Sequence, residues 1–331
     1  ICLALTYFFY RHQMEDQRQH LLQVLDERAK HSVARIEKRL HSYQQILEDT
    51  ASLLMLKPDL DDRAFKAHVD RLQLENRFPG TLGLSFTRAL TKANLEAYLA
   101  QQRISRPWFD IHPPPGKRES LAVVTFIEPL TLQNRKILGF DTSVEQERAA
   151  LLVHTRDQSQ LMVSGVILLV QDQDGKPSPA VLITAPVYAY GAVLDTVEAR
   201  RRHLLGWSNA SLRISDFIHG VLGEDVSASS SRLLIRLFDV DAGGKTALLF
   251  ENDLPDNTRP DTNARQKTVD IPFAGRIWRV EFTTLPSFDK HAGHHWPHET
   301  AILGTLGSIL LACVLWLVIH GRNNALRLSW R

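Results

Sequence analysis

Four histidines close to the C-terminal end are the most conspicuous candidates for chemistry in this sequence. They are His291, His294, His295 and His298. The first and third are four residues apart, a spacing that places two imidazoles on one face of a helix and can bind Zn²⁺ or Cu²⁺. Gly293 and Pro297 disfavour a regular helix there, so we expect a solvated linker over residues 291–300, with a metal site or a pH input as the alternative.

A carboxylate at Asp141 is the second candidate. It follows an apolar run at residues 137–140 that predicts the end of a buried strand, and a helical pattern begins directly afterwards. Asp141 could cap that helix, but Thr142 and Glu145 already have the spacing of a capping box. We therefore expect the carboxylate of Asp141 to line a pocket and to accept hydrogen bonds there, with a cap or a salt bridge as the alternative.

Signatures of catalysis do not accompany these residues. The sequence has neither H-E-x-x-H nor G-x-S-x-G, and its polar residues form no recognisable triad or carboxylate pair. Its two cysteines, Cys2 and Cys313, lie in apolar segments at the two ends. The region between them therefore has no disulfide and no cysteine nucleophile or metal ligand, and we expect neither enzymatic activity nor a cofactor in this segment.

The composition is that of an ordinary folded protein. The chain has 331 residues, of which 44% are hydrophobic and 23% charged, enough for one or two domains with cores of their own. A formal net charge of +2 gives no support for a nucleic-acid partner, which would require a clustered basic face.

Both ends of the chain are apolar. Residues 301–319 carry no charge and would span about 28 Å as a helix, close to the thickness of a bilayer's hydrocarbon core. Arginines without acids follow over residues 320–331, which places that flank in the cytoplasm. Residues 1–10 are interpreted as the end of a first membrane helix, with a signal-peptide core as the alternative. Two spans predict a multi-pass inner-membrane protein whose intervening region is periplasmic.

One long helix is predicted over residues 11–57, because no Gly or Pro occurs before Pro58 after the apolar start. Two seven-residue series make a sustained stripe along it, as in a coiled-coil seam. They are Leu22, Ala29, Ile36, Tyr43 and Thr50, and Val33, Leu40, Leu47 and Leu54. This pattern favours a stalk that pairs with a second copy in a homodimer, and a helix packed on its own domain is the alternative.

The rest of the chain predicts an α+β fold of two lobes. Strand, helix and strand patterns occur over residues 58–200 and restart over residues 201–290, where residues 204–213 read as the first strand of the second lobe. We expect two antiparallel sheets, each with flanking helices, bracketed by the two membrane helices.

The stretch from about residue 75 to residue 285 resembles the CHASE domain, the extracellular sensor module of histidine kinases and nucleotide cyclases. The strongest piece is "FIEPLTLQNRKILGFDTSVEQERAAL", in which Glu128-Pro129, Asn134, Gly139, Asp141 and Arg148 match the family's pattern. "FPGTLGLSFTRAL", "LITAPVYAYG" and "GRIWRVEFTTLPSF" occur in the expected order around it.

This resemblance implies a long N-terminal helix, a membrane-distal and a membrane-proximal PAS-like lobe, a dimer, and a ligand pocket in the distal lobe. Matched residue by residue, the family's ligand contacts fall on Asp141, Val163 and Thr184, with Phe86 and Phe126 as walls. Arg148 is expected to be a structural ion-pair partner of Glu128 or Asp141.

The sequence as a whole predicts the sensory portion of a transmembrane receptor. A small molecule, purine-like or an organic acid, would bind the distal lobe and signal across the lipid bilayer to a cytoplasmic diguanylate cyclase or histidine kinase. Gly304, Ser308 and Ala312 form a row of small residues that allows close helix approach. A structural dimerisation module without a ligand and a metal-dependent extracytoplasmic enzyme are the alternatives.

Overall fold

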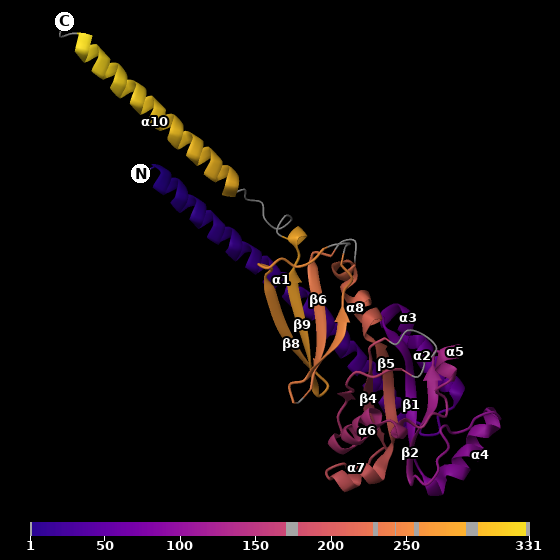
Figure 1. The fold of residues 1–331 in the computed structure, drawn as a ribbon. Helices are drawn as coiled ribbons and strands as arrows, with labels where there is room; N and C mark the ends of the chain where they lie inside the picture. The colour runs from indigo at the N-terminus through magenta and orange to yellow at the C-terminus, as the bar shows by residue number, and fades with distance from the viewer. Residues whose placement is uncertain are drawn as a thin grey trace.

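The computed structural model describes residues 2–169, 178–227, 231–241, 243–254, 258–288 and 297–328 of the chain. It has the α+β architecture that the sequence predicts, with a 55-residue helix, α1 (Cys2–Leu56), followed by two lobes that are each built on an antiparallel sheet (Figure 1). The histidines at residues 291, 294 and 295 and the side chain of His298 lie outside the described residues.

The first lobe contains a five-stranded sheet in the order β2-β1-β5-β4-β3. Its strands are β1 (Thr81–Thr91), β2 (Ser120–Glu128), β3 (Met162–Val163), β4 (Ala180–Tyr188) and β5 (Leu204–Arg213). Its helices are α2 (Asp62–Leu72), α3 (Leu74–Arg77), η1 (Lys92–Asn94), α4 (Leu95–Ser105), α5 (Leu132–Arg135), η2 (Thr142–Val144), α6 (Gln146–Gln158) and α7 (Val197–His203). The carboxylate of Asp61 caps the start of α2 by accepting a hydrogen bond from Ala64 N at 2.8 Å.

The second lobe contains a four-stranded sheet in the order β7-β6-β9-β8. Its elements are α8 (Ile214–Leu222), η4 (Gly223–Val226), β6 (Leu233–Val240), β7 (Thr246–Glu251), β8 (Gln266–Phe273) and β9 (Arg276–Thr284). α8 connects the two sheets and ends at Gly223, whose φ of +58° is one that glycine adopts readily.

The boundary between the lobes differs from the prediction at residue 200. β5 was expected to open the second lobe, but it lies inside the first sheet, between β1 and β4. A hydrophobic pattern identifies a strand without naming its partners, and β5 pairs with the preceding strand β4 and with β1, which lies far back in the sequence. The first lobe therefore extends to Arg213.

The apolar run at residues 137–140, which predicted the end of a buried strand, does not lie in a strand. Residues 136–139 form a turn, because Gly139 has a φ of +83° and a Cβ there would stand 2.0 Å from Asp110 O. The described part of the apolar stretch that follows β3 makes a single bridge, between Ile167 and Ala180. Both stretches are apolar because they are buried beside the sheet, and burial alone does not make a strand.

The apolar stripe of α1 is buried against the chain's own sheets. Leu25, Leu40 and Leu47 are at most 1% exposed, and α1 contacts β4 and β5 of the first lobe and β8 and β9 of the second. Tyr43 donates a hydrogen bond to Pro79 O at 2.6 Å. The alternative of a helix packed on its own domain is therefore what the structure shows over these residues, and the stripe does not form a seam between two copies.

The last helix, α10 (Pro297–Leu328), lies beside the start of α1, and the two extend away from the lobes together (Figure 1). A Cβ at Gly304 would stand 2.7 Å from the methyl group of Thr6, so the small residues of α10 allow close approach to α1 of the same chain. Among the described residues, none of the helices combines the length and the apolar character that a membrane crossing requires. The structure therefore does not support the predicted bracketing by two membrane helices.

The substitution Leu40→Ala tests the packing of α1. Because Leu40 is 1% exposed within the shared core, we expect a loss of about 2–5 kcal/mol of unfolding free energy in urea denaturation. Leu22→Ala is the matched control on the same helix, since Leu22 is 43% exposed and should cost no more than about 0.5 kcal/mol. Equal losses in the two variants would contradict this packing.

Candidate ligand-binding site

The two faces of the first sheet differ in chemistry. Along β1, Leu84 and Phe86 belong to the core shared with α1, whereas Ser85 and Thr87, which alternate with them, point to the opposite side. Because side chains alternate in a strand, the neighbouring strands continue both rows. Val181, Ile183, Ala210 and Leu212 continue the apolar face, and Leu182, Thr184, Asn209 and Ser211 continue the other.

Asn209 is the centre of a polar network on that second face. Its Nδ2 donates to Thr87 Oγ1 at 3.0 Å and to Trp207 O at 3.1 Å, and its Oδ1 accepts from Thr184 Oγ1 at 3.0 Å. Three strands are thus joined through buried side chains. Within the described part of the chain, the hydroxyls of Ser85 and Ser211 have no hydrogen-bond partner, and both residues line a cavity.

This cavity lies between the polar face and the segments that cover it. Ser85, Thr87, Leu182, Asn209 and Ser211 make its floor, and the cover includes Phe140, Thr142, Arg148, Ile167 and Leu169. Its free volume is about 30 Å³, which is room for roughly two waters. The mixture of apolar walls and a few polar groups is typical of a small-molecule site, and its small size means that a larger ligand must move the cover.

Arg148 supplies the positively charged group that lines the cavity. Its side chain is 6% exposed, its Nε and Nη1 each lie 3.2 Å from an oxygen of Glu145, and its Nη2 donates to Leu168 O at 3.0 Å. The guanidinium also lies 5.8 Å from the centre of the Phe140 ring. Burial lowers the pKa of Arg148, and the charge of Glu145 opposes that shift. Arginine nevertheless stays protonated in proteins, so the cavity holds a fixed positive charge.

Comparison with known proteins assigns the chain to a family. The model of the CHASE domain family matches residues 58–250, which is more than half of the chain. The chain therefore belongs to the CHASE domain family. Because CHASE domains are extracellular sensor modules, the matched region is an extracytoplasmic sensor segment.

Among solved structures, the chain is similar to the periplasmic sensory domain of the Campylobacter jejuni chemoreceptor Tlp1. The two share 10% sequence identity over 79% of this chain and 93% of that chain, with a TM-score of 0.50. At this identity the likeness shows the fold alone. Among curated proteins, no match was found.

Thr184 is the one predicted ligand residue that lies on the cavity side of the CHASE sheet, where it bonds to Asn209. Val163, Phe86 and Phe126 belong to the core on the opposite face. The rings of Phe86 and Phe126 stack at 6.3 Å between centroids, and Phe126 stacks on Phe65 of α2 at 5.2 Å. These two aromatic side chains hold α2 on the sheet.

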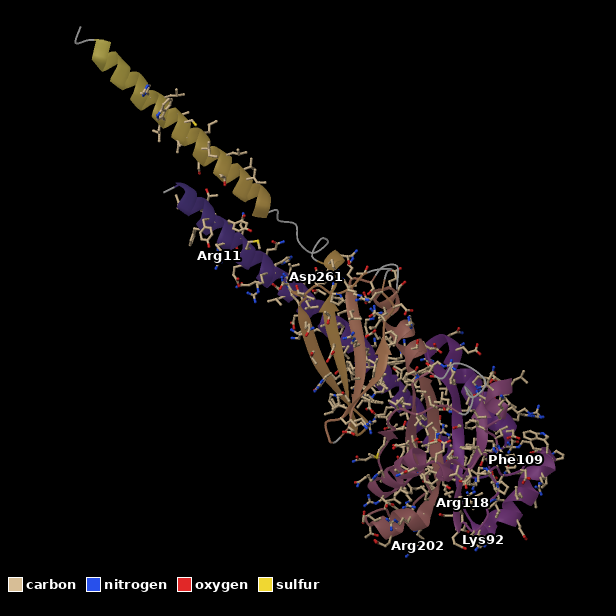
Figure 2. The ribbon with its side chains drawn as sticks, in the orientation of Figure 1. Arg11, Lys92, Phe109, Arg118, Arg202 and Asp261 are labelled. Carbon is tan, nitrogen blue, oxygen red and sulfur yellow. The ribbon has the colours of Figure 1, made fainter. Side chains whose placement is uncertain are left out.

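Asp141 is buried without lining the cavity. Its Oδ1 accepts from Ala122 N at 3.0 Å and from the backbone and hydroxyl of Ser143, so the residue caps η2, and Oδ2 lies 3.0 Å from Nη2 of Arg118. Arg118 lies in the part of the first lobe farthest from the two chain ends (Figure 2). The cap and salt-bridge alternative that the sequence left open is thus what the structure shows.

The capping box predicted after Asp141 does not form. The hydroxyl of Thr142 donates to Ala122 O at 2.9 Å, and Glu145 makes no side-chain cap. Glu145 instead pairs with Arg148, the arginine that the sequence had paired with Glu128 or Asp141. Polar residues at alternate positions of apolar strands, such as Ser85 with Thr87 and Asn209 with Ser211, were the available signal for the cavity floor that sequence reasoning missed.

Val163 connects the two lobes. Its N–H donates to Ala274 O at 3.0 Å, in the turn between β8 and β9. Next in that turn, a Cβ at Gly275 would stand 2.9 Å from Met162 Cε. Arg276 follows and pairs with the buried carboxylate of Asp239 at 2.5 and 2.6 Å. The short strand β3 therefore joins the cavity cover to the second lobe.

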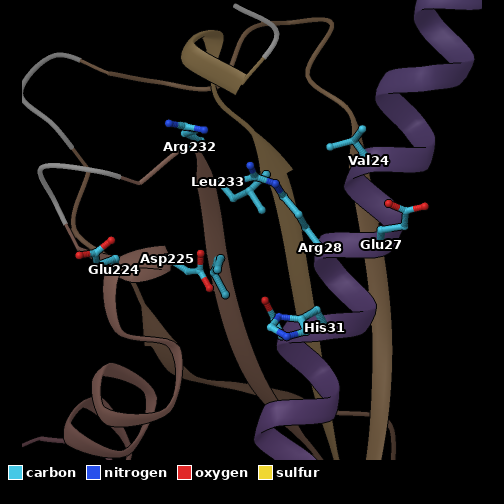
Figure 3. A pocket seen from close by; sticks show the side chains of 10 residues that line it. Val24, Glu27, Arg28, His31, Glu224, Asp225, Arg232 and Leu233 are labelled. Carbon is cyan, nitrogen blue, oxygen red and sulfur yellow. The ribbon is translucent and has the colours of Figure 1, made fainter. Parts of the chain in front are cut away.

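A larger hollow of about 500 Å³ lies between α1 and the second lobe (Figure 3). Glu27, Arg28 and His31 of α1 line one side, and Glu224, Asp225 and Arg232 line the other. Most of these side chains are exposed and they carry charges of both signs. Such a solvated groove differs from the enclosed, largely apolar sites that hold small molecules, so the cavity on the sheet is the better candidate.

The structural role of Asp141 predicts the effect of Asp141→Ala. Removal of a buried carboxylate that meets three backbone or hydroxyl donors and an arginine should lower the unfolding free energy by about 3 kcal/mol. Asp70→Ala, which removes an exposed ion pair with Lys66, should cost less than about 1 kcal/mol. Urea denaturation of both variants measures the difference, and an unchanged stability of Asp141→Ala would refute the assignment.

Proposed function

We propose that this chain is the sensory portion of a signalling receptor, and that a small molecule binds in the cavity on the polar face of the first sheet. The observation that carries the proposal is a buried cavity with two unpaired hydroxyls, an ordered amide and a buried guanidinium. Because these hydroxyls face the cavity and have no partner in the described part of the protein, a ligand that enters it can bond to them. In this site Thr184 orients Asn209.

Ligand entry would be transmitted to the second lobe through the cover. Arg148 holds Leu168 O, and a few residues earlier Val163 is bonded to the turn of the second lobe at Ala274. A ligand that moves Arg148 would therefore shift the strand that joins the lobes. To signal, the ligand must bind the two arrangements with different affinity.

The ends of the chain would carry this change onward. Phe8 is 64% exposed and Leu303 and Leu310 are each 69% exposed, which makes an apolar surface on the paired ends of α1 and α10. We propose that this surface lies in a lipid bilayer of the inner membrane, that two copies pair, and that a cytoplasmic output domain such as a diguanylate cyclase or histidine kinase responds.

The alternative of a structural module without a ligand gives no role to the cavity on the first sheet, whose lining includes the buried guanidinium of Arg148, and this cavity favours the sensor. The apolar face of α1 is used within the chain over Leu25–Leu54, so we propose that two copies pair through other surfaces. For the metal-dependent enzyme, the described residues contain no group of three metal-ligating side chains.

Filling the cavity tests the proposed site. We expect a thermal-shift screen of the full chain against purines, amino acids and organic acids to give ligands whose stabilisation disappears in Ser211→Phe, because the ring occupies the floor. Ser52→Phe places the same ring on the exposed side of α1 and should leave the shifts unchanged. Ligands that stabilise Ser211→Phe as strongly as the natural chain would place binding elsewhere.

Hydrogen exchange tests the connection between lobes. With a ligand identified in that screen, the amide of Val163 should exchange about tenfold more slowly, equivalent to ~1.4 kcal/mol of added local stability, because the ordered cover holds β3 against Ala274. The amide of Leu285, bonded to Arg232 O at the opposite end of the second sheet, is the control. An unchanged rate at Val163 would show that the cover does not couple the lobes.

A further inference from the structure

Arg148 and Glu145 form an ion pair whose two partners differ in burial, and this difference indicates the class of ligand. The arginine side chain is 6% exposed and lines the cavity, whereas the Glu145 side chain is 41% exposed and approaches from the residue that directly precedes the same helix. Both Glu145 contacts are 3.2 Å long, longer than the ~2.8 Å that is usual for a charge-assisted bond. The carboxylate of Glu145 is thus a loosely held partner of a deeply buried cation.

The remaining polar lining of the cavity is neutral. Ser85 and Ser211 offer hydroxyls, Asn209 is committed to Thr87 and Thr184, and Thr142 donates to Ala122 O. Arg148 therefore provides the charge of the site, and a carboxylate is the group that a guanidinium binds in a two-pronged geometry. Glu145 already supplies such a carboxylate from within the chain.

We propose that the ligand of this site is a small carboxylate that takes the place of Glu145 on Arg148, with its remaining polar atoms bonded to the hydroxyls of Ser85 and Ser211. This inference rests on the proposed sensory function and names its ligand class. Glu145 can withdraw at little cost because its side chain already reaches solvent. The Phe140 ring beside the guanidinium keeps the arginine in position during the exchange.

The exchange of partners also explains how a cavity of about 30 Å³ can receive a ligand. The space vacated by Glu145 adds to the cavity, and Arg148 must adjust to its new partner. Since Nη2 of Arg148 holds Leu168 O, this adjustment reaches the segment that leads back to β3. Glu145 thereby acts as an internal competitor that keeps the unliganded arrangement closed.

Matched acids and amides test the inference. The full chain is titrated by calorimetry with lactate and lactamide, succinate and succinamide, and alanine and alaninamide. We expect at least one acid to bind and its amide to bind at least about tenfold more weakly, because the amide has no charge to pair with Arg148. Arg148→Lys keeps the charge but loses the planar, two-pronged guanidinium, so it should lower the affinity for that acid by about tenfold.

Glu145→Gln is the second variant, and it changes affinity in the opposite direction. Loss of the internal competitor should tighten acid binding by about fivefold, because that factor corresponds to the free energy that a half-exposed ion pair contributes. Glu147→Gln is its control, because Glu147 lies two residues further along, in the first turn of α6, and is exposed, and it should leave the affinity unchanged. A gain of affinity cannot result from damage to the fold.

Two outcomes would overturn the inference. If acids and amides bind equally well and Ser211→Phe abolishes both, the cavity is a ligand site for neutral molecules and the sensory function stands without the carboxylate. If none of the acids binds either the natural chain or Glu145→Gln, small carboxylates are excluded as the ligand class. A different result would contradict the sensory function itself, namely ligands whose thermal stabilisation of the chain is unchanged in Ser211→Phe.

Discussion

The alternation of polar and apolar side chains along β1, β5 and β4 is the constraint on which the rest of the structure depends. One residue of slippage in any of these strands would place Asn209, Thr87 or Thr184 in the apolar core and expose a leucine or valine to the cavity. The hydrogen bonds of Asn209 to both neighbouring strands hold this register. One face of the sheet can then receive α1, and the other can enclose a polar cavity.

The long helix α1 makes the two lobes a single packed unit. Its buried stripe runs from the second lobe into the first, and one continuous core contains Leu25, Leu40 and Leu54 together with Trp278 of β9 and Phe217 of α8. Besides their common support α1, the lobes meet where Gly80 lies against Phe217 of α8 and where β3 meets the β8–β9 turn. The proposed ligand cavity is covered by the segment that leads to the β3 contact, which is why we expect occupancy and lobe arrangement to be linked.

Local patterns in the sequence predicted the parts of the fold that local chemistry decides. The long helix and the family both follow from patterns within continuous stretches of the sequence. The partner of β5 and the use of the α1 stripe depend on contacts between distant residues, which periodicity does not reveal. Asp141 illustrates the same limit at the site, because its role is set by Arg118 and Ala122, both about twenty positions away.

The most direct test of this account is the crystal structure of the full chain with the acid that binds most tightly. The account predicts that the bound carboxylate lies on the polar face of the first sheet, paired with the guanidinium of Arg148, and that Glu145 has turned to solvent. A ligand seated instead in the charged groove beside Glu27 and Asp225, with the Arg148 and Glu145 pair intact, would contradict it.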